Sequence, residues 1–232
     1  MEFAPDGPMA IPMWVNGHAY LTVVERFFDV VDAKSGAAIR RVPLCGATEA
    51  EAAAAAAKAA QPDWAASGLQ ARRVCLGNLA DALDRLEGHF AKLLQQETVA
   101  DEEGAKAQVQ AAVAALRGAA VGDTGVIGVV VDDGKPLSAF AAAIAPAVLA
   151  GATVVVKPSP RAPSAVFALC ELSSRAEWPA GVLNLLQGDQ AALEGLCASG
   201  IDRLVYRGRA ELGAQVAKVA AAAGVAVEPS EA

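Results

Sequence analysis

From Gly125 onward, the sequence alternates between short Val-rich runs and amphipathic runs of helix length. Near-continuous apolar strands separated by helices are typical of a parallel sheet that is covered on both faces and joined by right-handed crossovers. The sequence therefore predicts an α/β fold built on a doubly wound, Rossmann-like, five-stranded parallel sheet. The expected strands are residues 125–131, 153–156, 182–186, 203–206 and 225–227.

The residues before this alternation predict a layer of strands and helices. Met13 to Gly17 reads as a short strand, and residues 27–44 read as two strands joined by a turn at Lys34-Ser35-Gly36. We therefore divide the chain into an N-terminal hairpin and helical layer, residues 1–120, and a Rossmann-like domain, residues 121–232. The two parts are expected to form one compact unit.

The first helix of this layer is predicted from its capping pattern. Thr48 and Glu51 have the spacing of a capping box, which predicts a helix that starts there and continues to about Ala60. Pro62 follows, and proline normally ends a helix. The sequence therefore places a break at this proline.

Two further helices are expected before the sheet. Ser67 and Gln70 form a second capping pattern, and apolar residues then recur at helical spacing from Val74 to Leu93. This pattern predicts one long helix. A further helix is expected from about Asp101 to Leu116.

Charge and hydropathy disfavour nucleic acid and membrane partners. The net charge is −7 and the sequence pI is about 4.9, with the basic residues scattered along the chain. The longest apolar run, 140–156, is interrupted by Pro146 and Gly151, and so predicts a helix, a turn and a strand. The first twelve residues hold two acids, no base and three prolines, which does not fit a signal peptide. A cytoplasmic location is expected.

No metal site or disulfide framework is expected. The four cysteines lie far apart and have neither a metal-binding spacing nor a disulfide pattern, and the two histidines have no ligand pattern around them. The cysteines at 170 and 197 sit in helix-patterned apolar stretches, where buried, inert thiols are expected. These residues are Cys45, Cys75, Cys170, Cys197, His18 and His89.

A candidate site follows from topology. Ligands of doubly wound sheets bind beyond the carboxyl ends of the strands. Lys157 is the strongest candidate, because an ammonium that faces a crevice suits a phosphate or a ribose hydroxyl. Alternatively, Lys157 lies at the sheet edge with its amine in solvent, or pairs with Asp132 or Asp133. The strand ends carry Asp132-Asp133-Gly134, Lys157-Pro158-Ser159, Gln187-Gly188-Asp189, Arg207-Gly208-Arg209 and Glu228.

Six stretches, taken in order, resemble the first half of an aldehyde dehydrogenase. They are "MWVNG", "FDVVDAKSGAAIRRVPL", "GVIGVVV…KPL", "APAVLAGATVVVKPSPRAPSA", "WPAGVLNLLQG" and "YRGRAELGAQVAKVAA". The resemblance covers nearly the whole chain and is most specific from Ala145 to Gly188. It implies that residues 121–232 form a domain of the NAD-binding type, in which Lys157 contacts the adenosine ribose.

The resemblance also implies the cofactor residues and where they depart from the family pattern. Pro160 replaces a glutamate that binds ribose, and the stretch from Asp132 to Pro136 replaces a Pro-Trp-Asn-Phe-Pro motif whose asparagine serves the oxyanion hole. Two aspartates near a pyrophosphate repel it unless a cation such as Lys135 offsets them. NAD is thus the implied cofactor, with weak or absent binding. The implied cofactor-binding residues are Lys157, Ser159, Gly188, Gly208, Arg209 and Gly213.

The resemblance further implies that this chain is inactive alone. Glu228 aligns with the general base of the family, but Ser230 and Glu231 replace the glycine pair that follows, so no catalytic role is assigned to it. None of the four cysteines aligns with the nucleophile, which belongs to a catalytic domain that these residues do not include. A short "LRGAAVGDT" stands where the family inserts an assembly hairpin, so self-assembly is expected to be altered.

Three functions remain open from the sequence. The first is a non-catalytic subunit that assembles with a full-length NAD-dependent aldehyde dehydrogenase or with itself, similar to the trailing domains of bifunctional proline-utilisation enzymes and of double-domain aldehyde dehydrogenases. The second is a nucleotide-binding module that uses Lys157 and Arg209. The third is one half of a split dehydrogenase that oxidises aldehydes to acids or acyl products.

Overall fold

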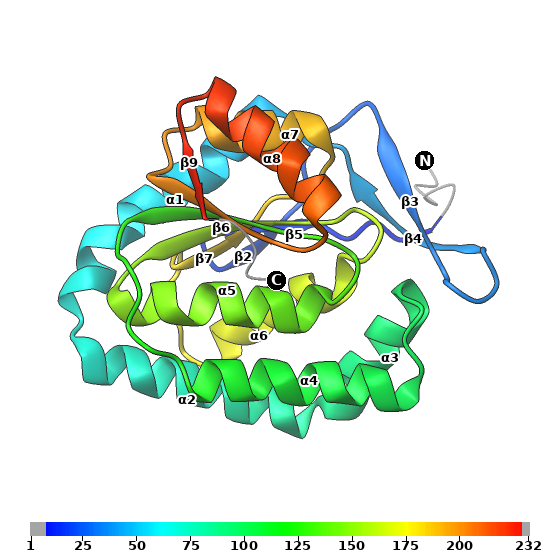
Figure 1. The fold of residues 1–232 in the computed structure, drawn as a ribbon, viewed down its shortest axis with the longest axis horizontal. Coiled ribbons are helices and arrows are strands. Elements are labelled where there is room, and N and C mark those ends of the chain that lie inside the picture. The colour runs from blue at the N-terminus through cyan, green and yellow to red at the C-terminus, as the bar shows by residue number, and fades with distance from the viewer. Residues whose placement is uncertain (1–7, 229–232) are drawn as a thin grey trace, which may run out of the picture.

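The computed structural model describes residues 8–228 and has a central sheet in the order β2-β1-β7-β6-β5-β8-β9 (Figure 1). The strands from β7 to β9 are parallel, which confirms the predicted α/β class with its five parallel strands. Two antiparallel strands, β1 and β2, extend the sheet beyond β7. The strands are β1 (Met13–Val15), β2 (His18–Tyr20), β5 (Val126–Val131), β6 (Thr153–Pro158), β7 (Leu183–Leu185), β8 (Arg203–Arg207) and β9 (Ala226–Glu228).

The β1–β2 hairpin joins the N-terminal segment to the sheet edge. Asn16 and Gly17 both have positive φ, 52° and 78°, as a two-residue hairpin turn requires. The backbone N–H of Asn16 donates to Oδ1 of the buried Asn184, at 2.9 Å, and Trp14 pairs with Leu185 of β7. The predicted strand near residue 13 is thus part of the main sheet.

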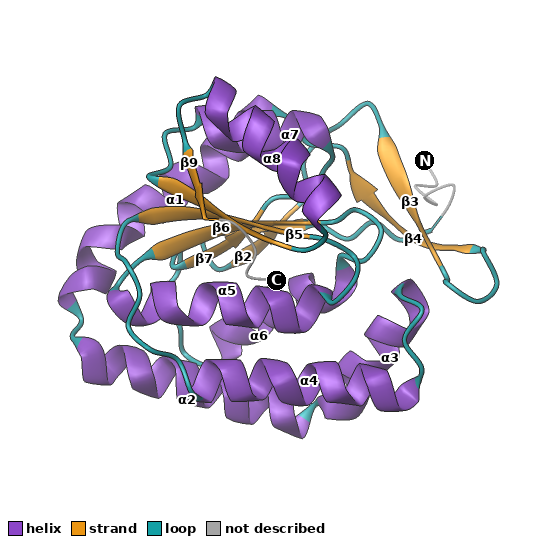
Figure 2. Cartoon of the chain, in the orientation of Figure 1, coloured by secondary structure: helices purple, strands orange, loops and turns teal. Residues whose placement is uncertain are grey.

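Helices cover both faces of the sheet (Figure 2). On one face, α5 packs on alternate residues of β5, such as Ile127 and Val129, and α6 packs beside it on β7 and β1. The helices α2, α3 and α4 form a second layer outside them. On the other face, α1, α7 and α8 pack on the intervening residues, such as Val126 and Val130. The helices are α1 (Ala47–Ala66), α2 (Leu69–Arg85), α3 (Glu87–Glu97), α4 (Glu102–Arg117), α5 (Pro136–Ala150), α6 (Ser164–Arg175), α7 (Gln190–Ala198) and α8 (Ala210–Ala222).

A separate two-stranded sheet, β3 (Phe27–Val31) and β4 (Ala38–Pro43), confirms the predicted hairpin. It is tied to the helices by the buried carboxylate of Glu97, which pairs with Arg40 at 3.2 Å and accepts the backbone N–H of Ser164 at 2.9 Å. Burial raises the pKa of Glu97 despite these partners. The cluster joins the hairpin to α3 and α6.

The first helix differs from its prediction at both ends. Its N-cap is Gly46, whose backbone N–H donates to Glu49 at 2.9 Å, so the Thr48–Glu51 capping box is wrong. It also runs through Pro62 to Ala66 rather than ending near Ala60. The buried Trp64 explains the extension, because its indole N–H donates to the carbonyl of Val148 at 3.1 Å. Tertiary contact therefore outweighs the local effect of proline.

The second helical prediction is also corrected. Ser67 ends α1, with its hydroxyl donating to the carbonyl of Trp64 at 2.7 Å, and Gly68 caps α2, so the Ser67–Gln70 capping box is wrong. The long helix expected from residue 74 to residue 93 is divided at Leu86, which lets α3 turn to contact both α4 and α6. The helix expected from Asp101 is confirmed as α4, with Asp101 as its N-cap.

The close approach of α7 to α1 gives a stability test at Gly195. A Cβ there would lie 2.8 Å from the Cα of Ala47 and 3.0 Å from the Cβ of Ala50. Gly195→Ala is therefore expected to lower the free energy of unfolding by about 1–3 kcal/mol through overpacking. Gly77→Ala in α2, where nothing lies within 4 Å, is expected to raise it by up to about 1 kcal/mol. Urea unfolding measures both, and equal stabilisation by the two changes would contradict the packing account.

Candidate functional site

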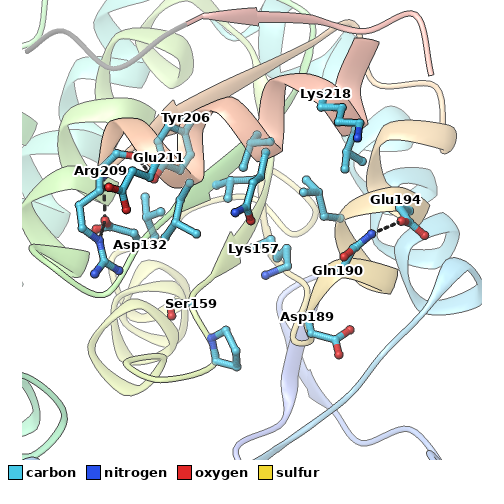
Figure 3. A pocket seen from close by; sticks show the side chains of 18 of the residues that line it. Asp132, Lys157, Ser159, Asp189, Gln190, Glu194, Tyr206, Arg209, Glu211 and Lys218 are labelled. Atoms are coloured by element: carbon cyan, nitrogen blue, oxygen red, sulfur yellow. Dashed lines mark hydrogen bonds and ion pairs between the residues drawn. The ribbon is translucent and has the colours of Figure 1, made fainter. Parts of the chain in front are cut away.

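A pocket of about 1060 Å³ lies at the carboxyl ends of β5, β6 and β8 and continues between α7 and α8 (Figure 3). From β5 the chain continues to β6 and β7 on one side of the sheet, and then returns to β8 and β9 on the other side of β5. The order of the strands therefore reverses at β5. Such a switch point is where doubly wound sheets bind ligands. The side of the pocket away from the sheet is largely apolar, with Leu193 from α7 and Val216 and Val219 from α8.

Lys157 lies in the middle of the pocket in Figure 3, between the group labelled Asp132 and Arg209 and the group labelled Asp189 and Glu194. It is only 7% exposed, and burial lowers its pKa to about 8, although Asp189 opposes the shift. Its amine donates to the carbonyl of Pro158, at 3.3 Å.

Neither structural alternative for Lys157 holds. A side chain 7% exposed does not extend into solvent, and the two aspartates pair with Arg209. No carboxylate among residues 8–228 forms an ion pair with Lys157, although Asp189 is near enough to raise its pKa, and an unpaired buried ammonium is unusual for a purely structural lysine.

Asp132 and Asp133 surround Arg209 at one end of the pocket. Oδ2 of Asp132 accepts both the backbone N–H and the Nε–H of Arg209, each at 2.9 Å, and Oδ1 accepts the backbone N–H of Gly134 at 2.9 Å. Asp133 forms a second ion pair with the same guanidinium. Arg209, rather than Lys135, is thus the cation that offsets the aspartates, and Arg209 is the N-cap residue of α8.

Gly208 and Gly213 pack closely against two residues that line the pocket, Asp132 and Tyr206. Gly208 has φ +157°, and a Cβ on it would lie 2.5 Å from Cγ of Asp132. A Cβ on Gly213 would lie 3.0 Å from the ring of Tyr206, whose hydroxyl donates to the carbonyl of Arg209 at 2.9 Å. Burial, reinforced by Asp132, raises the pKa of Tyr206 to about 12. Both glycines therefore lie next to residues that line the pocket, but neither glycine lines it.

The other predicted residues divide between the pocket and its surroundings. Ser159 and Pro160 line the pocket, and Ser159 Oγ accepts the backbone N–H of Arg161 at 3.3 Å. Gly188 lies outside the lining, where a Cβ would meet Ala192 at 2.8 Å. Glu228 is on β9, away from the pocket lining, and pairs with Arg207 at 2.7 Å.

The pocket residues on α7 and α8 were not predicted from the sequence. Gln190 donates to Glu194 at 2.7 Å on α7, and both line the pocket. On α8 the lining residues recur at helical spacing, which was a usable signal, because a helix that follows a strand end presents one face to the crevice. These α8 residues are Glu211, Leu212, Gln215, Val216, Lys218, Val219 and Ala222.

The four thiols lie elsewhere. Cys45, Cys170 and Cys197 are buried and Cys75 is half-buried, and none of them lines the pocket. Burial raises the pKa of each thiol, that of Cys45 to about 12. All four therefore stay protonated, and a protonated thiol is a weak nucleophile and a weak metal ligand.

Two other features are absent from residues 8–228. No group of three or more His, Cys, Asp or Glu side chains is arranged to hold a metal ion in this part of the chain. Over the same residues, every helix is too short or too polar to cross a membrane.

Comparison with known proteins places the chain in a family. The model of the aldehyde dehydrogenase family matches residues 20–122 and 123–228, and the chain belongs to this family. It is 30% identical to the N-succinylglutamate 5-semialdehyde dehydrogenase of Chromohalobacter salexigens over 86% of this chain and 44% of the relative. The corresponding enzyme of Caulobacter sp. strain K31 is 34% identical over 79% of this chain and 43% of its own length. The chain thus spans less than half the length of these relatives.

Solved structures confirm the fold. The methylmalonate-semialdehyde dehydrogenase of Oceanimonas doudoroffii superposes with a TM-score of 0.89 at 20% identity, over 97% of this chain and 51% of that one. PnpE in complex with nicotinamide adenine dinucleotide superposes with a TM-score of 0.86 at 23% identity, over 94% of this chain and 50% of that one. The α/β architecture is therefore shared with both of these solved structures, and the second of them was solved with the dinucleotide bound.

The buried Lys157 gives a stability test. Replacing it with methionine removes a desolvated charge, so Lys157→Met is expected to raise the free energy of unfolding at pH 7 by up to about 3 kcal/mol, the energy of the pKa shift. The pKa is lower in the folded chain, so the penalty is complete below pH 8 and disappears as the pH rises to 10.5. The advantage of the variant over the wild type should shrink over that interval in urea unfolding.

The matched control is Lys218→Met, an exposed lysine on the same pocket wall, which should change stability by less than about 0.5 kcal/mol. If Lys157→Met instead destabilises the chain at pH 7, Lys157 is a structural residue and its assignment to a ligand site is wrong.

Proposed function

We propose that this chain is a non-catalytic subunit of the aldehyde dehydrogenase family that helps a full-length NAD-dependent dehydrogenase, or a second copy of itself, to assemble. The observation that carries the proposal is the placement of its thiols. Aldehyde oxidation in this family proceeds through an activated thiolate, and each thiol of this chain is outside the pocket with a raised pKa.

The candidate general base supports the same proposal. Glu228 is paired with Arg207 on the outer strands of the sheet, and it does not line the pocket. A carboxylate that is paired with a guanidinium outside the pocket is poorly placed to deprotonate a water inside it. Neither catalytic group of the family thus has a working counterpart among the described residues.

Exposed apolar side chains support the assembly role. Five large apolar residues between positions 20 and 31 are each at least 40% exposed, on β2, on β3 and on the loop that joins them. Exposed apolar surface of this kind marks interaction sites in soluble proteins. We call these residues the β2–β3 patch: Tyr20, Leu21, Val23, Phe27 and Val31.

The assembly test uses Val23, which is fully exposed in the isolated chain. Val23→Asp is expected to weaken assembly at least about 10-fold, because an interface would bury an unpaired carboxylate. Val99→Asp is the matched control, since Val99 is 99% exposed at the α3–α4 connection, outside the patch. Native mass spectrometry of the tagged chain purified from its own host measures assembly. A separate assay of the purified chain with NAD and an aldehyde measures activity as NADH formation.

Two results would contradict the proposal. One is NADH formation by the purified chain alone. The other is a strictly monomeric chain with no aldehyde dehydrogenase bound in stoichiometric amount. Equal loss of assembly in Val23→Asp and Val99→Asp would show that the interface is not specific to the β2–β3 patch. The cytoplasmic location stays a prediction.

A second candidate function is a nucleotide-binding module of the same pocket. The observation that favours it is Lys157, which is only 7% exposed and lines the pocket. Its ammonium can donate a hydrogen bond to a ribose hydroxyl there. Isothermal titration of the wild type and of Lys157→Met with adenosine tests it, with binding expected only for the wild type. The split-dehydrogenase alternative has less support, because Gly134 stands where the resemblance places the oxyanion asparagine of the family.

A further inference from the structure

The amino end of α8 already holds an anion, which is the carboxylate of Asp132. Helix amino ends attract phosphates because their backbone N–H groups are unpaired and the helix dipole is positive there. α8 has thirteen residues, and its N-cap residue, Arg209, donates its backbone N–H to Oδ2 of Asp132 at 2.9 Å. The carboxylate therefore takes the place that a ligand phosphate would use.

The surrounding residues hold this carboxylate firmly. Its two oxygens accept three N–H groups, two from Arg209 and one from Gly134, and the side chain is 4% exposed. Gly208 provides the room, because a Cβ there would lie 2.5 Å from Cγ of Asp132. A charge with this many donors is strongly stabilised in place.

The charge of the pocket also opposes a phosphate. The guanidinium of Arg209 faces two aspartates, so it has no uncompensated charge to offer. A diphosphate would also add its negative charges to a pocket lining that has one more acidic than basic side chain. The charged lining residues are five acids, Asp132, Asp133, Asp189, Glu194 and Glu211, and four bases, Lys157, Arg161, Arg209 and Lys218.

We propose that Asp132 is the specificity-determining residue of this pocket, which excludes phosphorylated ligands and admits an uncharged nucleoside. The apolar residues Leu193, Val216 and Val219 offer a wall for a planar base, and Lys157 offers a donor for a sugar hydroxyl. The nucleoside part of this inference rests on the nucleotide-binding candidate above. The exclusion of phosphate rests on the contacts of Asp132 and on the charge of the pocket, and does not depend on that candidate.

The test compares adenosine with ADP, two probes that differ only in the diphosphate. For the wild type, isothermal titration is expected to give at least about 10-fold weaker binding of ADP than of adenosine. Asp132→Asn keeps the shape of the side chain and removes its charge, which eliminates one of the two ion pairs of Arg209. This variant is expected to bind ADP at least about 10-fold more tightly than the wild type, with a smaller change in its affinity for adenosine.

The matched control is Asp133→Asn, which removes the same charge from the same guanidinium but leaves the amino end of α8 occupied. It should improve ADP binding less than Asp132→Asn does. Thermal unfolding of both variants checks that they are folded, and the wild-type comparison stands whether or not they are.

Three results would overturn the inference. The first is a wild type that binds ADP as tightly as adenosine. The second is an Asp132→Asn variant that is folded but gains no affinity for ADP. The third is an equal gain from Asp133→Asn. A wild type that binds no adenosine, together with an Asp132→Asn variant that binds ADP, would overturn only the nucleoside assignment and leave the role of Asp132 standing.

Discussion

The pairing of β5 with β6 on one side and with β8 on the other is the constraint on which the rest of the structure depends. It buries β5 on both faces and leads the chain away from it in opposite directions, which leaves a crevice at the strand ends. Gly128 in the middle of β5 makes the close packing possible, since a Cβ there would lie 2.6 Å from a methyl group of Leu204. The same pairing brings Asp132 and Arg209 together from positions 77 residues apart.

The crevice has the fold of the aldehyde dehydrogenase family, and the residues at its strand ends determine its chemistry. Lys157 is buried at the centre, and the desolvation of its ammonium lowers the stability of the chain. An apolar side chain at the same position would not have this cost. At the end nearest α8, Asp132 and Arg209 satisfy each other, so the groups best suited to hold a phosphate are engaged within the protein. Membership of the aldehyde dehydrogenase family therefore defines the fold of this chain, and its site residues define what the fold can bind.

The sequence predicted what depends on local patterns and missed what depends on contacts between distant segments. Val-rich runs predicted the parallel strands, and the helix expected from about Asp101 to Leu116 is observed as α4, because both depend on local sequence. The passage of α1 through Pro62 depends on Trp64 reaching Val148, and nothing near the proline indicates that contact. Likewise, the sequence showed that Asp132 and Arg209 differ from the family pattern, but only the fold shows that they pair.

The central claim is that a carboxylate of the protein occupies the anion position at the amino end of α8. A crystal structure of the chain grown in a high concentration of ADP tests it most directly. The account predicts that Oδ2 of Asp132 stays within hydrogen-bonding distance of the backbone N–H of Arg209, with no phosphate between them. A diphosphate bound to that N–H, with Asp132 turned away, would contradict it.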